Sequence, residues 1–429
     1  MSDKLKAEVW DKMQFLFRNF YDRTMHAAMV YDGKIDADKM SETLKYMIDS
    51  VPVLHSTFKN NAVKPYWKIS EYTVSDALDS VDTTDAELWT GIYSFLEHSV
   101  DYRGNVQVHA RLFYTETRSA IALIFNHMCF DGGDLKYFLG KLCQNYICAT
   151  EGKPFVAIKS GSRSCDAVYS NFSPEDEEKA RKLYKNVSAV HDHHTFPLSP
   201  DAKEDKLSII VRELDPELFN VFRKIGKAKG FTVNDLMLGA YVHSLYQYAE
   251  WDKTDSLHIP CMVDLRRHIK NGGAEYGLAN HTGFMICAVD GVTDDVTETV
   301  RRVAECNNRN KEDKFMGLYS IPLLKLAYKV FPQCIAEVAI KIGYDNPLIG
   351  MSNIGQMTHD LDLGSLTMVD GFMTGAVKYK PYMQLALITV LGVMKMSICI
   401  RGNDRDREMV NKFFDIYEQN IKDFIEQNK

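Results

Sequence analysis

The segment from Asn126 to Gly133, NHMCFDGG, holds the residue types best suited to chemistry in this 429-residue chain. The imidazole of His127 is the natural candidate for a general base, because histidine titrates close to neutral pH. Asp131 follows in a glycine-rich turn, where a carboxylate is better suited to fixing the loop by pairing with an arginine than to moving a proton. Gly132 and Gly133 allow backbone angles that other residues resist.

Two other chemical roles are weaker alternatives. Cys129 lies beside His127, but neighbours along a chain rarely face each other, so a packing role is a better interpretation than a nucleophile. The run from His191 to His194 suggests a metal, yet it lies in an irregular stretch and lacks the helical or CxxC spacing of a defined site. We therefore expect no metal in this protein.

A buried strand and a long helix are predicted to position His127. Residues 119–126 contain the continuously apolar run IALIF, which is typical of a central strand. Residues 134–150 carry apolar side chains at helical spacing. His127 is therefore expected where the strand ends and before the helix begins, a place where the rigid sheet holds a side chain that the turn exposes.

Helices and strands are mixed along the whole chain, which predicts an α/β (α+β) protein. Residues 151–206 show no sustained periodicity and carry many charges with scattered glycine and proline. Such composition is typical of a boundary between domains. We expect residues 1–165 to form a first lobe carrying His127, residues 166–206 to connect, and residues 207–429 to form a second lobe. Further helices are expected over residues 36–50, 216–229, 294–310 and 404–427 and from Thr232, where Asp235 completes a capping box.

Composition and charge exclude several classes of protein. With 45% hydrophobic and 25% charged residues, the chain is neither disordered nor of low complexity. Its net charge of −7 argues against a nucleic-acid binder, which would present a basic surface. The most apolar stretch, residues 383–400, alternates in its second half, which predicts a hairpin about Leu391-Gly392 instead of a transmembrane span. Nine scattered cysteines without a CxxC pair and an N-terminus without an apolar core predict a cytoplasmic protein.

The segment NHMCFDGG and several others along the chain resemble motifs of an acyltransferase superfamily. That superfamily includes chloramphenicol acetyltransferase, nonribosomal peptide condensation domains, alcohol acetyltransferases and wax ester synthases. The hallmark of that family is HHxxxDG, and His127, Asp131 and Gly132 match it, whereas Asn126 replaces the first histidine. The remaining similarity spans nearly the whole chain. In the N-terminal part, residues 13–18 resemble the opening helix motif, and residues 52–58 resemble the PxLRxxF segment, with His55 in place of the arginine. In the C-terminal part, four segments resemble family motifs: residues 232–235 (TxND), 260–267 (PVDLRR), 277–283 (the GN segment) and 352–355 (SNxG).

The resemblance implies two chloramphenicol acetyltransferase-like lobes, each a mixed sheet with helices, arranged as a V with an active-site tunnel between them. It implies that His127 takes the proton from a small hydroxyl or amine acceptor, which attacks an acyl thioester directly without an acyl-enzyme. Asp131 would be structural, paired with Arg266 in preference to Arg18. Asn126 and Gly132 would support the loop, whereas Asn280, Ser352 and Asn353 would line the tunnel or polarise the thioester.

The family also implies the partners of the reaction. The favoured donor is acyl-coenzyme A as a co-substrate, with no permanently bound cofactor. A condensation-type reaction with a donor on the phosphopantetheine of an acyl carrier protein is an alternative. A non-catalytic binding protein with the same fold is a third hypothesis, supported only by the departures from the family motifs at Asn126 and His55. Because a two-lobed chain builds its own site, a monomer can suffice.

Overall fold

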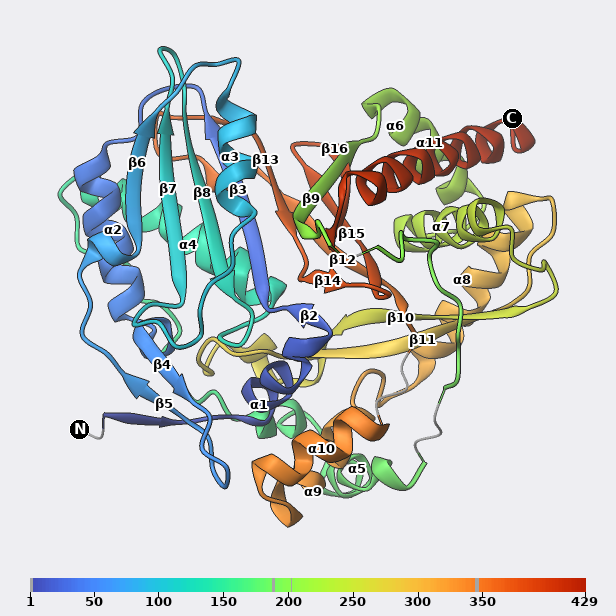
Figure 1. Cartoon of the computed structure of the whole chain (residues 1–429), viewed down its shortest axis with the longest axis horizontal. Helices are drawn as coiled ribbons and strands as arrows, with labels where there is room; N and C mark the ends of the chain where they lie inside the picture. The colour runs from blue at the N-terminus through green and yellow to red at the C-terminus, as the bar shows by residue number, and fades with distance from the viewer. Residues whose placement is uncertain (1–2, 187–189, 202, 344–346) are drawn as a thin grey trace.

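The computed structural model describes residues 3–186, 190–201, 203–343 and 347–429, which form two lobes that lie side by side, each built on a mixed sheet (Figure 1). The first sheet has five strands in the order β13-β3-β8-β7-β6. All eight residues of β8 are buried, as the predicted central strand requires. The strands of this first sheet are β3 (Thr24–Tyr31), β6 (Leu78–Asp82), β7 (Val108–Tyr114), β8 (Ser119–Asn126) and β13 (Met368–Thr374).

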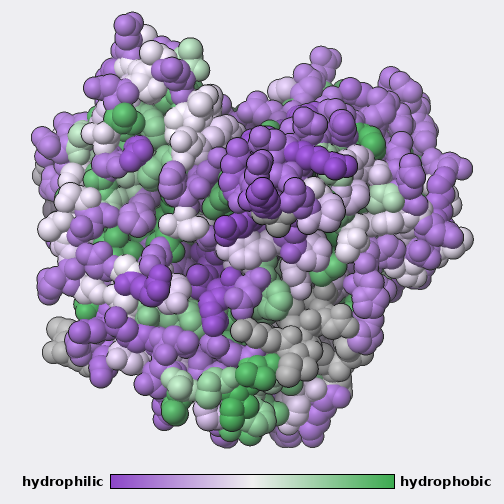
Figure 2. Space-filling model, in the orientation of Figure 1, coloured by the Kyte–Doolittle hydropathy of each residue, from purple (hydrophilic) through white to green (hydrophobic). Residues whose placement is uncertain are grey.

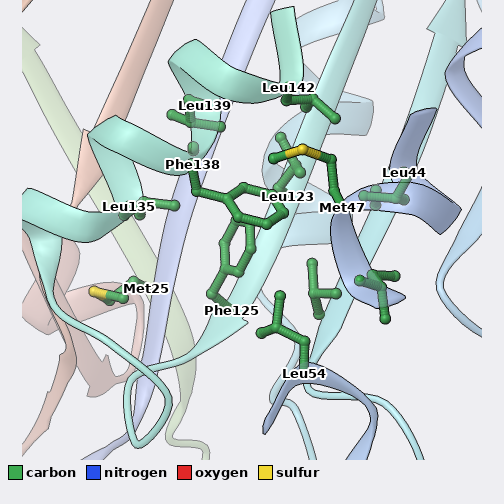
Figure 3. Packing of buried hydrophobic residues seen from close by; sticks show 14 of the residues in the cluster. Met25, Leu44, Met47, Leu54, Leu123, Phe125, Leu135, Phe138, Leu139 and Leu142 are labelled. Atoms are coloured by element: carbon green, nitrogen blue, oxygen red, sulfur yellow. The ribbon is translucent and has the colours of Figure 1, made fainter. Parts of the chain in front are cut away.

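Helices cover both faces of this first sheet. The helices α2 (Ala37–Asp49) and α4 (Gly132–Thr150) pack on one face, and α3 (Leu88–Leu96) packs on the other. Figure 3 shows Leu123 and Phe125 of β8 beneath Phe138 of α4. The rings of Phe125 and Phe138 meet edge to face with their centroids 5.3 Å apart. This core fixes the strand and the helix on either side of His127.

The second sheet has eight strands, with the order β11-β10-β12-β15-β16-β14-β2 and β9 paired to β16. Four helices pack against its core. The sheet contains β2 (Tyr21–Asp22), β9 (Lys206–Glu213), β10 (Ser256–Asp264), β11 (Thr282–Asp290), β12 (Ile349–Met357), β14 (Val377–Tyr379), β15 (Met383–Val390) and β16 (Val393–Gly402), and its helices are α6 (Pro216–Ala228), α7 (Val233–Ala249), α8 (Val296–Glu312) and α11 (Asp404–Gln427).

The two lobes exchange strands. β13 comes from the C-terminal part of the chain but pairs antiparallel with β3 in the first sheet. β2 comes from the N-terminal part but pairs with β14 in the second sheet. A division of the chain at residues 165 and 207 therefore does not describe these two strands, and the polypeptide crosses between the lobes more than once.

Smaller elements surround the two sheets. Figure 2 shows apolar side chains gathered on the surface formed by α9 and α10, where Leu323, Val330 and Ile335 are exposed. These elements are α1 (Val9–Leu16), α5 (Pro174–Arg181), α9 (Ser320–Val330), α10 (Gln333–Gly343), a small sheet of β1 (Lys4–Lys6), β5 (Tyr66–Ile69) and β4 (Ser56–Lys59), and short 3-10 helices at Phe17–Asn19, Pro52–His55, Val74–Asp76, Cys165–Tyr169, Leu183–Asn186, Leu265–His268, Lys270–Gly273 and His359–Leu361.

Most of the predicted elements are present. Asp36 caps α2 by accepting a hydrogen bond from the Lys39 amide, and Thr232 and Asp235 form the capping box of α7. The hairpin of β15 and β16 turns at Leu391 and Gly392, both with positive φ. No helix within the described ranges has both the length and the apolar composition to cross a bilayer. The helices α9 and α10 were not predicted.

Candidate active site

The loop that carries His127 is fixed by hydrogen bonds on both sides of the histidine. The His127 amide donates to the Arg23 carbonyl over 2.6 Å, which ties it to the start of β3. The Asn126 side chain donates to Oε1 of Gln107 over 2.6 Å and accepts from the Met128 amide at 3.0 Å. Asn126 is buried, so these contacts satisfy its polar atoms where water cannot. The backbone that presents the imidazole is therefore held in one conformation.

A residue of the second lobe contacts the His127 ring. Asn280 lies just before β11, and its Nδ2 is 3.2 Å from Nδ1 of His127 and 3.1 Å from the His127 carbonyl oxygen. The side chain of Asn280 is almost fully buried. The imidazole therefore sits at the junction of the lobes, with its backbone held by the first lobe and its ring contacted by the second.

Burial lowers the pKa of His127 below its usual value, and the positive charge of Lys378 lowers it further. The carboxylate of Asp131 and the carbonyl groups of His127 and Phe130 act in the opposite direction but do not restore it. The ring is therefore neutral near pH 7, which leaves a nitrogen lone pair able to accept a proton.

Asp131 is buried and forms the N-cap of α4. Its Oδ1 accepts the amide hydrogens of Gly133 at 2.9 Å and of Asp134 at 3.0 Å. Its Oδ2 accepts from the His281 amide at 2.6 Å. A carboxylate with this many donors is stabilised in its charged form. Asp131 therefore holds the loop, the helix and the segment before β11 together.

Arg266 pairs with Asp131 across the lobes. Its Nη2 lies 3.0 Å from Oδ1 of Asp131, and its Nη1 lies 3.2 Å from Oδ2. The same guanidinium contacts Asp134 at 2.9 Å and Asp264 at 2.9 Å. Arg18, the other predicted candidate, instead pairs with Glu337 at 3.2 Å.

The two buried carboxylates around Arg266 have opposite pKa shifts. Burial alone would raise the pKa of Asp131, but the charge and hydrogen bonds of Arg266 lower it to about 2. For Asp134, burial and the negative charge of Asp131 outweigh Arg266 and raise the pKa to about 6. Asp131 thus stays ionised at neutral pH and is unsuited to exchanging protons during a reaction.

Of the two glycines after Asp131, only Gly133 is required for its small size. Neither Gly132 nor Gly133 has a positive φ, so neither position uses the left-handed backbone angles that glycine allows. A Cβ at Gly133 would lie 2.8 Å from Nη1 of Arg266, whereas a Cβ at Gly132 would meet nothing within 4 Å. Gly133 is therefore needed because the guanidinium packs directly on the backbone of the first helical turn.

Ser352 and Asn353 lie on β12, in the second sheet. Asn353 is exposed, and its side chain contacts the Asn234 side chain at 3.4 Å and accepts from the Gly355 amide at 3.1 Å. Among the hydrogen bonds of the described residues, none joins Ser352 or Asn353 to His127. The structure thus brings together His127, Asn126, Asp131, Arg266 and Asn280, but not these two residues.

Arg163 is a site residue that the sequence did not reveal. Its Nη2 donates to the Cys129 carbonyl at 2.8 Å, and its guanidinium forms a bidentate ion pair with buried Asp11 at 3.0 and 3.1 Å. Its Nε donates to the Leu278 carbonyl at 2.9 Å. No local pattern marks Arg163 in the sequence, because its partners lie in three distant segments.

The alternatives based on Cys129 and on the histidine run find little support in the geometry. Burial raises the pKa of the Cys129 thiol far above its usual value, which suppresses the nucleophilic thiolate. Asp192 is buried and accepts hydrogen bonds from the amides of His194 at 2.9 Å and His258 at 2.6 Å. In the part of the chain that the structure describes, no three potential ligands are grouped to hold a metal ion.

Two cavities of the described part of the chain lie away from His127. One of about 340 Å³ is lined by residues of the first lobe, among them His98 and His109. Another of about 180 Å³ lies between the lobes, where Asp22 and Ser99 face Tyr379 and Arg401. Neither is lined by His127, so the chemistry is located by the hydrogen-bonded residues and not by cavity size.

The condensation domain family model matches residues 13–428. No curated protein sequence matches the chain. The structure is similar to TRI3 trichothecene 15-O-acetyltransferase from Fusarium sporotrichioides, with a TM-score of 0.72 and 12% identity over 98% of this chain and 95% of that one.

Two further structures share the architecture. SgcC5 from Streptomyces globisporus has a TM-score of 0.72 and 13% identity over 99% of both chains. The first condensation domain of the calcium-dependent antibiotic synthetase has a TM-score of 0.70 and 14% identity over 98% of this chain and 96% of that one. The predicted fold of two lobes, each a mixed sheet with helices, is thereby confirmed.

Proposed function

The chain belongs to the condensation-domain family of acyltransferases, and from this membership we propose that it transfers an acyl group from a thioester to a hydroxyl or amine acceptor with His127 as general base. The observation that carries the proposal is the neutral imidazole of His127, whose ring is contacted by Asn280 from the opposite lobe. A neutral histidine with a fixed ring is what proton abstraction from an acceptor requires.

We assign the ring proton of His127 to Nδ1. The ring makes a hydrogen bond with the carbonyl group of His127 itself, and Nδ2 of Asn280 is 3.1 Å from the same oxygen. A carbonyl oxygen can accept two hydrogen bonds, one from Nδ1–H and one from Asn280, and the 3.2 Å approach of Nδ2 of Asn280 to Nδ1 is then a packing contact between two donors and not a hydrogen bond. Nε2 then keeps its lone pair, and it is the atom that receives the proton of the acceptor.

The proposed reaction proceeds without an acyl-enzyme. Nε2 of His127 takes the proton from the acceptor O–H or N–H as its oxygen or nitrogen forms a bond to the thioester carbonyl carbon. The carbonyl π electrons move to oxygen, giving a tetrahedral oxyanion. When this oxyanion collapses, the C–S bond breaks and the thiolate leaves with its electron pair. The imidazolium of His127 returns the proton to the sulfur, which restores the neutral base.

Asp131 and Arg266 have a positioning role in this proposal. Their ion pair joins the N-terminus of α4 to the end of β10, so it holds the two lobes at the distance that His127 and Asn280 need. Asn126 acts on the same loop through Gln107. We also propose that a tunnel between the lobes admits the donor and the acceptor to His127, with Ser352 and Asn353 along its length.

We favour acyl-coenzyme A as the donor. The structurally similar TRI3 is a trichothecene 15-O-acetyltransferase, and the fold is shared over 98% of this chain. A donor on a carrier protein is the second candidate, favoured by the family match to condensation domains. The two can be distinguished with the same acyl group presented on coenzyme A or on an acyl carrier protein.

The test is a thiol-release assay over panels of acyl-coenzyme A donors and of alcohol and amine acceptors. We expect turnover with the wild-type protein and a fall of at least about 100-fold in kcat for His127→Ala, since general bases contribute that much. His359→Ala, at an exposed histidine on the surface, is the matched control and should keep full activity. A His127→Ala protein as active as the wild type would refute the assigned mechanism.

A further inference from the structure

The helices α9 and α10 expose apolar side chains to solvent. Val330 and Val338 keep 59% and 55% of their accessible area, and Figure 2 shows apolar side chains gathered over these helices at the lower edge of the molecule. The exposed large apolar residues of the two helices and of the turn between them are Leu323, Leu326, Val330, Phe331, Ile335 and Val338. A gathered apolar surface of this kind marks a binding face.

Helical spacing turns these side chains outward. Leu323, Leu326 and Val330 recur at intervals of three and four residues along α9, so they share one side of the helix. The opposite side is buried in the protein through Ile321 of α9 and Ala336 of α10. Each helix is therefore apolar toward the protein and also apolar toward solvent.

A backbone hydrogen bond joins the start of α10 to the tip of the β4–β5 hairpin. The Cys334 amide donates to the Ala62 carbonyl over 3.2 Å. Val63 follows at the tip and is 62% exposed. The tip and the two helices reach the lower edge of the molecule together (Figure 1). We call residues 59–64 and the exposed side chains of residues 320–339 the lower face.

Lysines crowd the small sheet that carries this hairpin. Lys59, Lys64 and Lys68 are exposed, and residues 56–69, all of which the structure describes, contain no acid. Lys4 of β1 stands directly opposite Lys68 in the β1–β5 ladder. Like charges directly opposite each other destabilise a sheet, so an anionic partner would relieve this repulsion.

The charges on the two helices are positive or paired. Lys329 is exposed at the end of α9. Glu337 is the one acid in residues 320–339, which the structure describes in full, and it pairs with Arg18 at 3.2 Å. The whole chain has a net charge of −7, so the lower face is opposite in charge to the protein average.

The acidic helix α5 lies beside α9 but adds little net charge. Arg181 of α5 and Lys325 of α9 both bind Asp166, with Arg181 at 2.8 Å, which places the two helices next to each other. Three glutamates of α5 each pair with a base four residues further along the chain, and these pairs are Glu175–Lys179, Glu177–Arg181 and Glu178–Lys182. The lysines of the lower face therefore keep their attraction for an anionic partner.

We propose that the lower face docks on a lipid bilayer whose surface carries anionic headgroups. Aliphatic side chains and phenylalanine beside lysines are typical of elements that lie in a membrane interface, where the apolar groups enter the acyl boundary and the lysines contact headgroups. The apolar part here comes from α9, α10 and Val63, and the lysines come from the adjoining hairpin.

A protein partner fits this face less well. Arginine, tyrosine and tryptophan are enriched in protein interfaces and lysine is depleted there. None of the first three is exposed in residues 56–69 or 320–339, ranges that the structure describes completely. A second copy of the chain, docked by the same face around a two-fold axis, would bring further lysines and no exposed acid to pair with them.

Vesicle sedimentation tests the proposal with the full chain. The probes are vesicles of phosphatidylcholine alone and of an equimolar mixture of phosphatidylcholine and phosphatidylserine. We expect the wild-type protein to bind the mixed vesicles at least about tenfold more tightly than phosphatidylcholine alone, and raised salt to weaken this binding by screening the lysines. A wild-type protein that sediments with neither kind of vesicle would overturn the proposal.

The lysines are tested by a paired substitution in the hairpin. Lys59→Gln combined with Lys64→Gln should weaken binding to the mixed vesicles about 10- to 30-fold, since a lysine near an anionic bilayer contributes about fivefold. Lys224→Gln combined with Lys227→Gln is the matched control, because both residues are exposed on α6, far from the lower face (Figure 1). The control should bind as tightly as the wild type.

The apolar side chains are tested in the same assay. Val330→Ser combined with Val338→Ser should weaken binding about tenfold or more, because both side chains would lose their contact with the acyl boundary. Both are exposed, so the midpoint of thermal unfolding should not change. Val221→Ser on α6 is the control. Binding that survives at full strength in both the lysine and the valine variants would show that the lower face is not the contact.

Two further measurements separate docking from self-association and from the reaction. If sedimentation equilibrium without vesicles shows a wild-type dimer that Val330→Ser with Val338→Ser dissociates, the face joins two copies and the proposal is wrong. Docking goes beyond the acyl transfer proposed above and does not rest on it, so His127→Ala should bind mixed vesicles as tightly as the wild type. A protein that binds vesicles but transfers no acyl group keeps the docking face and loses the proposed reaction, and the reverse result does the opposite.

Discussion

Arg266 of the second lobe and Asp131 of the first meet as a bidentate ion pair, with Nη2 3.0 Å from Oδ1 and Nη1 3.2 Å from Oδ2. Asp131 is buried and Arg266 is largely enclosed, and the carboxylate also caps the helix that follows His127. Loss of either partner would leave a charge without compensation inside the protein, which is far more costly than loss of a surface pair.

Arg266→Met should destabilise the protein by about 3–5 kcal/mol, because Asp131 and Asp134 would remain buried without their cation. Chemical denaturation measures this as a lower midpoint. Arg301→Met, which removes an exposed arginine paired with Glu298, is the control and should leave the midpoint unchanged within error. Equal effects of the two substitutions would show that the buried pair has no special role.

Gly133→Ala should destabilise the protein by about 1–3 kcal/mol, since its methyl group would lie too close to the Arg266 guanidinium. Gly132→Ala is a matched control one residue away, where the added methyl group meets open space. It should be neutral or stabilise the protein by about 0.4–1 kcal/mol through the unfolded state. Thermal unfolding of the two variants checks this prediction. A Gly132→Ala protein less stable than the Gly133→Ala protein would contradict it.

Asn280→Ala should lower kcat about tenfold or more with little change in KM, because His127 would lose the side chain of the second lobe that packs against both its ring and its carbonyl group. Nitrogen NMR of the imidazole provides an independent check, with the Nδ1–H tautomer dominant in the wild type and mixed in the variant. A wild-type protein that holds its proton on Nε2 would contradict the assigned role of this atom.

The pH profile of kcat/KM should rise to a plateau with a midpoint below 6.5, because the base must be neutral and burial lowers the pKa of His127 from that value. Activity is therefore lost as pH falls through the pKa of His127 and is kept above it. Lys378→Met should move the midpoint to higher pH, since the lysine charge lowers the pKa of His127. A midpoint above 6.5 in the wild type would contradict this picture.

The sequence was most informative where the signal is local. The apolar run before Asn126 and the helical spacing after Asp134 predicted the strand and helix around His127, and the structure has β8 and α4 there. The capping box of Thr232 and Asp235 is equally local, since two residues three positions apart at a helix start define it. Such features are determined by neighbouring residues, so their prediction does not depend on the fold.

Features made by distant segments could not be predicted in this way. Arg163 joins Asp11, Cys129 and Leu278, and nothing near residue 163 in the sequence distinguishes it from a surface arginine. The choice of Arg266 over Arg18 as the partner of Asp131 came from the family resemblance, because charge alone suits both. Lys378 gave no signal at all, since a lysine in a short strand is usually solvated.

The exchange of β13 into the first sheet has a consequence for how the protein is made. His26 and Thr374 are hydrogen-bonded neighbours although they are 348 residues apart. Contacts between residues so far apart in the sequence form slowly. Until β13 pairs with it, β3 is an unprotected edge strand that can pair with other chains. During synthesis on the ribosome, the first lobe therefore waits with an incomplete sheet until most of the second lobe has emerged.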